Sequence, residues 1–230
     1  MLPLRDVIPS HSTPYITLTI IALTTAVWLA ELSLPLASAA DNFSRFGIVP
    51  ARVTGWSLLT APFLHASWIQ VVCNMWSLWV FGENVEGRVG PVGFGVFYLL
   101  SSAVATLAYV LADPSSSLLV VGSSGAVAGV LGGYVVLYPG SRVLTLIPRV
   151  FGWDVVEVPS TALLGVWGLL QFVGGSVWLP TAHTHDPALA FATYLTAFLV
   201  GAAGLSITGH RRTPPEWWAT SSDRRSTSST

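Results

Sequence analysis

Long apolar stretches alternate with shorter polar ones through most of this 230-residue chain. Six of the stretches are apolar enough to predict helices that cross a lipid bilayer, although the fifth is short for a hydrocarbon core of about 30 Å. They cover residues 15–36, 68–81, 91–112, 120–138, 160–175 and 188–207. The pattern therefore predicts an all-α membrane protein in which six transmembrane helices form a bundle.

The polar segments divide the chain into one membrane domain and two flanking pieces. Residues 1–13 are expected to form a cytoplasmic lead-in, residues 14–207 the membrane domain, and residues 208–230 a polar, disordered cytoplasmic tail. The connection over residues 37–64 is long and combines four aromatic side chains with two arginines. Aromatic residues gather where a membrane meets water, so this connection is predicted to lie in the membrane interface, with a solvated linker as the alternative.

The composition supports a membrane location and limits the possible partners. The chain is 52% hydrophobic and only 9% charged, whereas a soluble domain carries about 25% charged residues. A net charge of −1 gives no basic surface for nucleic acid. The single cysteine, Cys73, excludes an intramolecular disulfide, and its apolar surroundings in the sequence predict a buried, unreactive thiol.

The basic residues are distributed unequally between the two sides of the predicted bundle. Eight of the ten fall in the N-terminal segment, the second and fourth connections and the tail, and all ten are arginines. Only Arg45 and Arg52 fall on the opposite side. The excess of arginine on the cytoplasmic side predicts a multi-pass protein of the inner cell membrane with both termini in the cytoplasm.

The fourth apolar stretch is unusually rich in glycine and begins with two hydroxyl side chains. Gly125, Gly129 and Gly133 recur at every fourth residue, so they share one face of a helix and allow a neighbouring backbone to come close. Ser123 and Ser124 stand at the start of this stretch. A serine in this position is either a small residue in helix packing or a nucleophile.

Polar side chains also occur within or beside the second and sixth stretches. His65, Gln70 and Asn74 fall at the start of the second, and Tyr194 falls near the start of the sixth. Polar groups inside a membrane are costly and usually have a function. For Asn74 the alternative is a hydrogen bond between helices, and for His65 it is a contact that holds the long connection.

A second group of polar residues, His183, His185 and Asp186, precedes the sixth stretch. The group lacks the helical or paired spacing that is typical of metal ligands. We therefore expect neither a metal ion nor another cofactor.

Several segments in this order resemble the rhomboid family of intramembrane serine proteases, and the resemblance covers nearly the whole chain. They are HASWIQVVCNM at 65–75, FGENVEGRVG at 81–90, FYLLSS at 97–102, GSSGAVAG at 122–129 and LYPGSRVLTLIP at 137–148. The resemblance implies that Ser124 is the nucleophile and that Asn74 helps to stabilise the oxyanion. The family's second histidine of this region corresponds to Gln70, whose N–H could still serve the oxyanion. His65 corresponds to a histidine that is usually structural.

The sixth stretch departs from the family pattern at two places. The histidine that acts as the base in the family corresponds to Tyr194, and the following pair of glycines corresponds to Thr196 and Ala197. A phenol, with a pKa of about 10, is neutral at pH 7 and accepts a proton poorly, although it could hydrogen-bond Ser124. The larger side chains of Thr196 and Ala197 are predicted to hold the sixth helix further from the fourth.

Two functions remain open at this point. One is an intramembrane serine endopeptidase that cleaves single-span membrane proteins, with Ser124 in a hydrated cavity that is open to the outside. The other is a pseudoprotease that binds the transmembrane helices of client proteins without cleaving them. A transporter is disfavoured, because no stretch carries the paired ionisable residues that an ion path would need.

Overall fold

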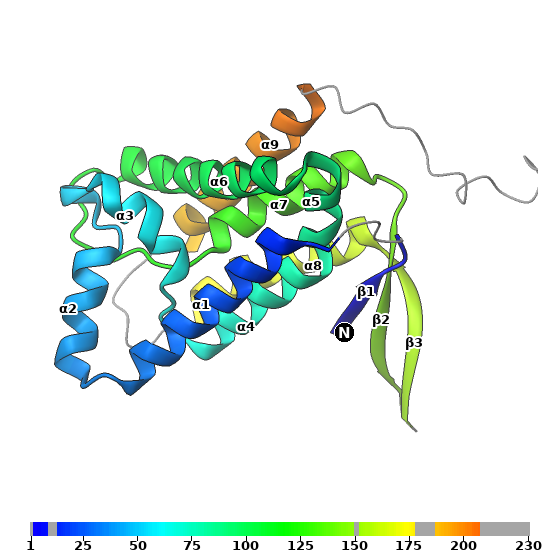
Figure 1. Cartoon of the computed structure of the whole chain (residues 1–230), viewed down its shortest axis with the longest axis horizontal. Coiled ribbons are helices and arrows are strands. Elements are labelled where there is room, and N and C mark those ends of the chain that lie inside the picture. Colours follow the sequence, from blue (N-terminus) through cyan, green and yellow to red (C-terminus); the bar gives the residue numbers. More distant parts are fainter. Residues whose placement is uncertain (1, 9–12, 150–151, 178–186, 208–230) are drawn as a thin grey trace, which may run out of the picture.

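The structure is a computed structural model, and it describes residues 2–8, 13–149, 152–177 and 187–207. Helices form most of the described chain, and a small sheet lies at one end of them (Figure 1). The longer helices are α1 (Tyr15–Ser33), α2 (Leu36–Phe46), α4 (Trp68–Ser77), α6 (Pro91–Ala112), α7 (Ser124–Leu137), α8 (Ser160–Val177) and α9 (Pro187–Ile207). The predicted group of His183, His185 and Asp186 and the predicted tail lie outside the described residues.

Three of the described helices are long and apolar enough to cross a membrane. They are α1, α6 and α9, and α6 has the same bounds as the predicted third span. Helix α7 and the stretch Ser160–Leu169 of α8 are apolar but shorter. The apolar pattern therefore predicted the positions of these helices. Of the described helices, α1, α6 and α9 are also long enough to cross a bilayer.

The second predicted span continues further than the apolar pattern suggested. Helix α4 passes through a π-helical turn, η3 (Leu78–Gly82), into α5 (Glu83–Val89), so the predicted polar connection at 82–90 is mostly helical. The buried Glu86 explains this difference. Its carboxylate accepts hydrogen bonds from the backbone N–H groups of Ile16 and Thr17, at 2.9 and 2.7 Å. It thereby satisfies donors that the first turn of α1 leaves unpaired.

The structure corrects the prediction of an all-α protein, because it contains a three-stranded antiparallel sheet. The strands are β1 (Leu2–Asp6), β2 (Arg142–Arg149) and β3 (Gly152–Pro159), in the order β1-β2-β3. Residues 2–6 thus form a strand within the predicted lead-in, and the fourth connection is a hairpin. The sequence does not predict this hairpin, because most of its residues are apolar on both faces. The alternation of apolar and polar residues that indicates a strand is therefore weak.

A buried carboxylate joins the sheet to the helices. Asp6 accepts hydrogen bonds from the Tyr134 hydroxyl, from Asn84 Nδ2 at 3.1 Å and from the Ile8 N–H at 3.1 Å. Burial raises the pKa of Asp6 above its usual range. These contacts attach the N-terminal strand to α7 and to α5.

The long first connection is helical rather than a loop. It forms α2, α3 (Gly55–Thr60) and two 3-10 turns, η1 (Pro50–Arg52) and η2 (Ala61–Phe63). Thr54 and Ser57 cap the start of α3 reciprocally. The aromatic side chain of Trp56 is 76% exposed, and its placement in the membrane interface stays a prediction.

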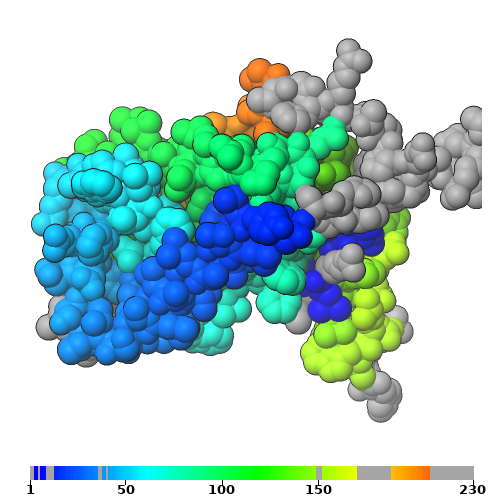
Figure 2. All heavy atoms as spheres, in the orientation of Figure 1, coloured from blue at the N-terminus to red at the C-terminus, as the bar shows by residue number. Residues whose placement is uncertain are grey.

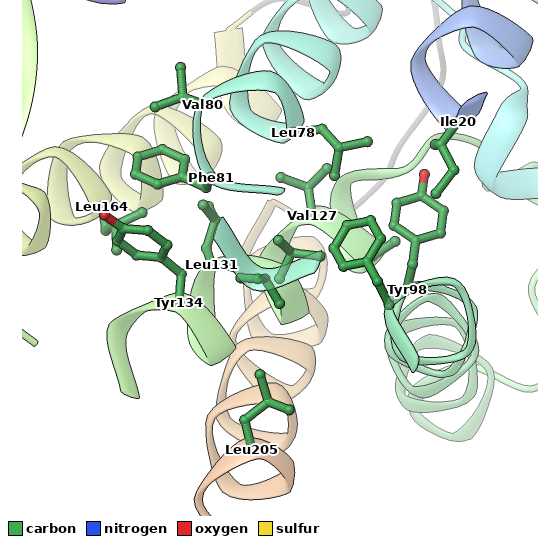
Figure 3. Packing of buried hydrophobic residues seen from close by; sticks show 14 of the residues in the cluster. Ile20, Leu78, Val80, Phe81, Tyr98, Val127, Leu131, Tyr134, Leu164 and Leu205 are labelled. Carbon is green, nitrogen blue, oxygen red and sulfur yellow. The ribbon is translucent and has the colours of Figure 1, made fainter. Parts of the chain in front are cut away.

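The hydrophobic core surrounds α7. Val127, Leu131 and Tyr134 of α7 are buried and pack within a cluster that includes Leu78 and Phe81 (Figure 3). The rings of Phe81 and Tyr134 meet edge to face, with centroids 4.9 Å apart. Because α7 is covered on all sides, it is apolar around its whole circumference rather than amphipathic.

The outer surface of the helices is also apolar, as a lipid-facing surface must be. Exposed side chains include Val92 and Leu100 on α6 and Trp68 on α4. Cys73 lies on the same α4 and is exposed, so the prediction of a buried thiol was wrong. The apolar sequence around Cys73 reflects contact with lipid rather than burial within the protein.

Helix α9 packs directly on α7, which contradicts the prediction that larger side chains keep the two apart. A Cβ on Gly201 would lie 2.8 Å from the Cα of Gly129, so the two backbones touch at these glycines. Thr196 is exposed and its hydroxyl donates to the Ala192 carbonyl, so it points away from α7. The two helices approach closely because of Gly201, which lies one helical turn after Ala197, the position at which the contact was predicted.

The glycine contact predicts a difference between two alanine variants of α9. Gly201→Ala should lower the free energy of unfolding by about 1–3 kcal/mol, because its Cβ overlaps the backbone of Gly129. Gly204→Ala is the matched control, because nothing lies within 4 Å of its Cβ position and alanine favours a helix. Thermal unfolding in detergent measures both, and equal Tm values would contradict the contact.

Candidate active site

Ser124 begins a helix that is too short to cross the membrane. Helix α7 has 14 residues, which is about 21 Å at 1.5 Å per residue, against a hydrocarbon core of about 30 Å. A helix of this length that reaches one surface of the membrane begins below the other surface. The segment before Ser124 therefore has a non-helical backbone inside the protein, which is tolerated at membrane depth only where the protein covers it.

The first connection and α4 satisfy the backbone of that segment. Val120 forms a two-way antiparallel bridge with Ile48, with N···O distances of 2.7 and 2.9 Å, and the Gly122 N–H donates to the Ala61 carbonyl at 3.0 Å. Gln70 Nε2 donates to the Val121 carbonyl at 3.1 Å. These contacts fix the direction in which the chain enters α7.

Gly122 is required for this arrangement. Its φ of +112° favours glycine, and a Cβ there would lie 3.0 Å from the Cδ of Gln70. The Oε1 of Gln70 also accepts from the Ala66 N–H at 3.1 Å. The Gln70 side chain thus orients the main chain before the serine, and its hydrogen bonds go to main-chain atoms rather than to Ser124.

Ser124 and Asn74 form a hydrogen-bonded side-chain pair at the centre of the site. Asn74 Nδ2 lies 3.2 Å from Ser124 Oγ, and the Ser124 hydroxyl lies 3.3 Å from Asn74 Oδ1. Both side chains are buried: Asn74 is 2% exposed and Ser124 is 4% exposed. The serine faces α4 inside the bundle rather than lipid.

His65 hydrogen-bonds Asn74 and Ser123, and no hydrogen bond joins it to Ser124 in the described part of the chain. Its Nε2 lies 3.2 Å from Asn74 Nδ2 and 3.3 Å from the Ser123 hydroxyl. An amide N–H can only donate, so His65 Nε2 is the acceptor and the ring is neutral. Burial lowers the pKa of His65 to about 4, which keeps it neutral at pH 7. Ser123, for which the sequence predicts no role, hydrogen-bonds His65 in the structure.

Tyr194 brings the third helix to the site. Its phenol, on α9, lies near the Ser124 side chain and interacts with it electrostatically. Helices α4, α7 and α9 thus converge on one hydroxyl, with an amide on one side and a phenol on the other. Neither group is a base at neutral pH, because a carboxamide and a neutral phenol both accept protons weakly.

The buried imidazole predicts a loss of stability in acid. The pKa of His65 is about 4 in the folded protein, against about 6.5 when unfolded. Stability is therefore complete above pH 6.5 and falls as the pH drops towards 4, by on the order of 3 kcal/mol at pH 4. Unfolding of wild type and His65→Gln between pH 7 and 4 tests this, and the variant should lose less stability over that range. Parallel pH profiles would contradict it.

Comparisons with known proteins place the chain in a family. The Rhomboid domain matches residues 52–211, more than two thirds of the chain. RHOMBOID-like protein 5 of Arabidopsis thaliana is 27% identical over 146 residues, which are 64% of this chain and 43% of that protein. RHOMBOID-like protein 6, mitochondrial, of the same plant is 36% identical over 109 residues, 47% of this chain and 31% of that protein.

A bacterial relative is similar over a comparable range. The putative rhomboid protease YdcA of Bacillus subtilis is 29% identical over 119 residues, which are 50% of this chain and 59% of that protein. The chain thus spans roughly a third to three fifths of the length of these relatives. The domain match includes α4, α7 and α9, which carry Asn74, Ser124 and Tyr194. The chain therefore belongs to the rhomboid family.

Proposed function

We propose that this rhomboid-family protein receives the transmembrane segments of single-span membrane proteins at the Ser124 site and binds them without cleaving them. The proposal depends on one observation: Ser124 hydrogen-bonds Asn74 with Tyr194 nearby, and the imidazole of His65 is engaged by Asn74 and Ser123. A serine hydroxyl needs a base within hydrogen-bonding reach to attack a peptide bond. Losing one member of a catalytic pair costs on the order of a millionfold in rate in a soluble serine protease.

The binding part of this proposal is supported by the buried position of the serine. The glycine contacts between α7 and α9 hold the Tyr194 region against the start of α7. Polar groups at this depth offer hydrogen bonds to a helix that unwinds locally, and such bonds are scarce in lipid. The pseudoprotease would thus recognise clients by unstable transmembrane helices.

An intramembrane serine endopeptidase is the second candidate. The observation in its favour is that Ser124 and Asn74, the proposed nucleophile and oxyanion donor, lie within hydrogen-bonding distance of each other. Ser124 begins α7, and Asn74 Nδ2, at 3.2 Å from its hydroxyl, could donate to an oxyanion. Gln70 could join it through its second amide N–H. The base would then come from His183 or His185, outside the described residues.

We further propose that the bundle crosses the membrane six times with both termini in the cytoplasm. The helical run of α4, η3 and α5 covers residues 68–89, about 33 Å at 1.5 Å per residue, which is enough for one crossing. Helix α7, together with the non-helical segment that precedes it, and helix α8 supply two more crossings. The N-terminal strand β1 lies at the end of the bundle towards which α9 runs (Figure 1), as an even number of crossings requires.

Labelling with a fluorophosphonate serine probe separates the two candidates. We expect wild type to label no faster than Ser124→Ala, because the nucleophile lacks a base. Tyr194→His should raise the labelling rate by about 10²–10⁴-fold, the usual contribution of a general base. Labelled protein is measured by fluorescence in a gel.

Two controls make this result specific. Tyr194→Phe removes the hydroxyl without adding a base and should stay unlabelled. Ser123→Ala in the Tyr194→His background should keep the label and Ser124→Ala in that background should lose it, which identifies Ser124 as the labelled residue. Labelling of wild type that disappears in Ser124→Ala would reject the pseudoprotease and direct attention to His183 and His185.

A further inference from the structure

A cavity of about 260 Å³ lies between the N-terminal strand and the helices, and we call it the β1 cavity. Strand β1 and the residues just after it form one wall, and η3 and the start of α5 form the other. Figure 2 shows the dark blue atoms of β1 between the yellow-green hairpin and the helical body. The cavity lies at the opposite end of α4 from Gln70 and is distinct from the Ser124 site.

The polar side chains of the β1 cavity offer hydrogen-bond acceptors. Asp6 and Asn84 line it and are both more than nine-tenths buried. The Asn84 Nδ2 is used by its bond to Asp6, and within the described part of the chain no group donates to the Asn84 side-chain oxygen. The carboxylate of Glu83, which is half-buried, has no donor among the described side chains either. A ligand that fits this wall must therefore supply hydrogen-bond donors.

The same wall is negatively charged. Burial raises the pKa of Asp6, and the nearby negative charge of Glu83 adds to this rise. Two carboxylates that share a site repel each other, and a cation close to both would relieve the repulsion. The ion pair of Arg142 with Glu157 lies on the hairpin, and no described side chain forms an ion pair with Asp6 or Glu83. The charge of the wall therefore favours a positively charged ligand.

The rest of the lining is apolar and aromatic. Leu4, Ile8 and Val80 offer a surface for methylene groups. The indole of Trp79 adds an aromatic ring, which attracts an ammonium group. Trp79 is also 57% exposed on the helical run that carries the lipid-facing Trp68. The cavity can therefore be reached from the surface that contacts lipid.

We propose that the β1 cavity binds a primary ammonium group, and that the ethanolamine headgroup of a phospholipid supplies it. An ammonium group has three N–H donors and no acceptor, which suits Glu83, the Asn84 side-chain oxygen and Asp6. The quaternary ammonium of choline has no N–H donor and should bind poorly. A bound headgroup joins β1 to α5 and so stabilises the N-terminal strand. This goes beyond the proposed function and holds for a protease and for a pseudoprotease alike.

Native mass spectrometry of the whole protein in detergent tests the proposal with dihexanoyl phosphatidylethanolamine and dihexanoyl phosphatidylcholine. We expect the ethanolamine lipid to bind at least about tenfold more tightly, because only its headgroup donates hydrogen bonds. Glu83→Gln should weaken its binding by about 10–100-fold, because a charge-assisted hydrogen bond is lost. Glu157→Gln is the matched control and should leave the affinity unchanged, because Glu157 is outside the cavity.

Two results would overturn the proposal. One is equal affinity for the two lipids, and the other is an unchanged affinity in Glu83→Gln. The Tm of Glu83→Gln without lipid should equal that of wild type, because Glu83 has no hydrogen-bond partner to lose among the described residues. A weaker affinity in this variant therefore reports on the ligand rather than on the fold.

Phosphoethanolamine, which has the same headgroup without acyl chains, distinguishes a lipid from a soluble amine. We expect it to compete with the lipid at least about tenfold less well, because it lacks contacts with the apolar surface beside Trp79. Competition at equal concentration would assign the cavity to a soluble amine and reject the lipid headgroup.

Discussion

The constraint on which the rest of the structure depends is a stretch of non-helical backbone that enters α7 below the membrane surface. Amide groups without partners are too costly in lipid, so every polar group of this stretch needs one. Ile48, Ala61 and Gln70 provide partners from outside α7. The long first connection is therefore helical and packed, because it has to bring these partners to the right depth.

The same constraint explains the composition of the site. Once the entry to α7 is fixed, Ser124 lies against Asn74, and His65 is held beside them by Asn74 and Ser123. The close contact of Gly129 with Gly201 brings α9 to the same point. The arrangement of Ser124 and Asn74 can thus persist for structural reasons, whether or not the site has a base.

Hydropathy predicted the helices well, because lipid demands apolar residues on any helix that faces it. It failed at residues 142–159, whose apolar side chains serve both the core and an exposed face and hide the alternation of a strand. The prediction for Thr196, which came from the comparison with the family pattern, was wrong because a single sequence does not reveal which turn of a helix meets its neighbour. In the structure the turn at Gly201 meets α7. The resemblance to the rhomboid family predicted that Asn74, Ser124 and Tyr194 lie in one site. The contact of His65 with Ser123 could not be predicted, because residues 58 positions apart meet only through the fold.

The pairing of β1 with β2 has a consequence for the order in which the protein assembles. Leu2 pairs with Leu146, and Asp6 pairs with Val143, so strand β1 waits for a strand that is synthesised after α7. Contacts between such distant parts of a chain form late. Strand β1 therefore joins the sheet only after the helices between it and β2 have been synthesised, so it is among the last of the described elements to reach its native place.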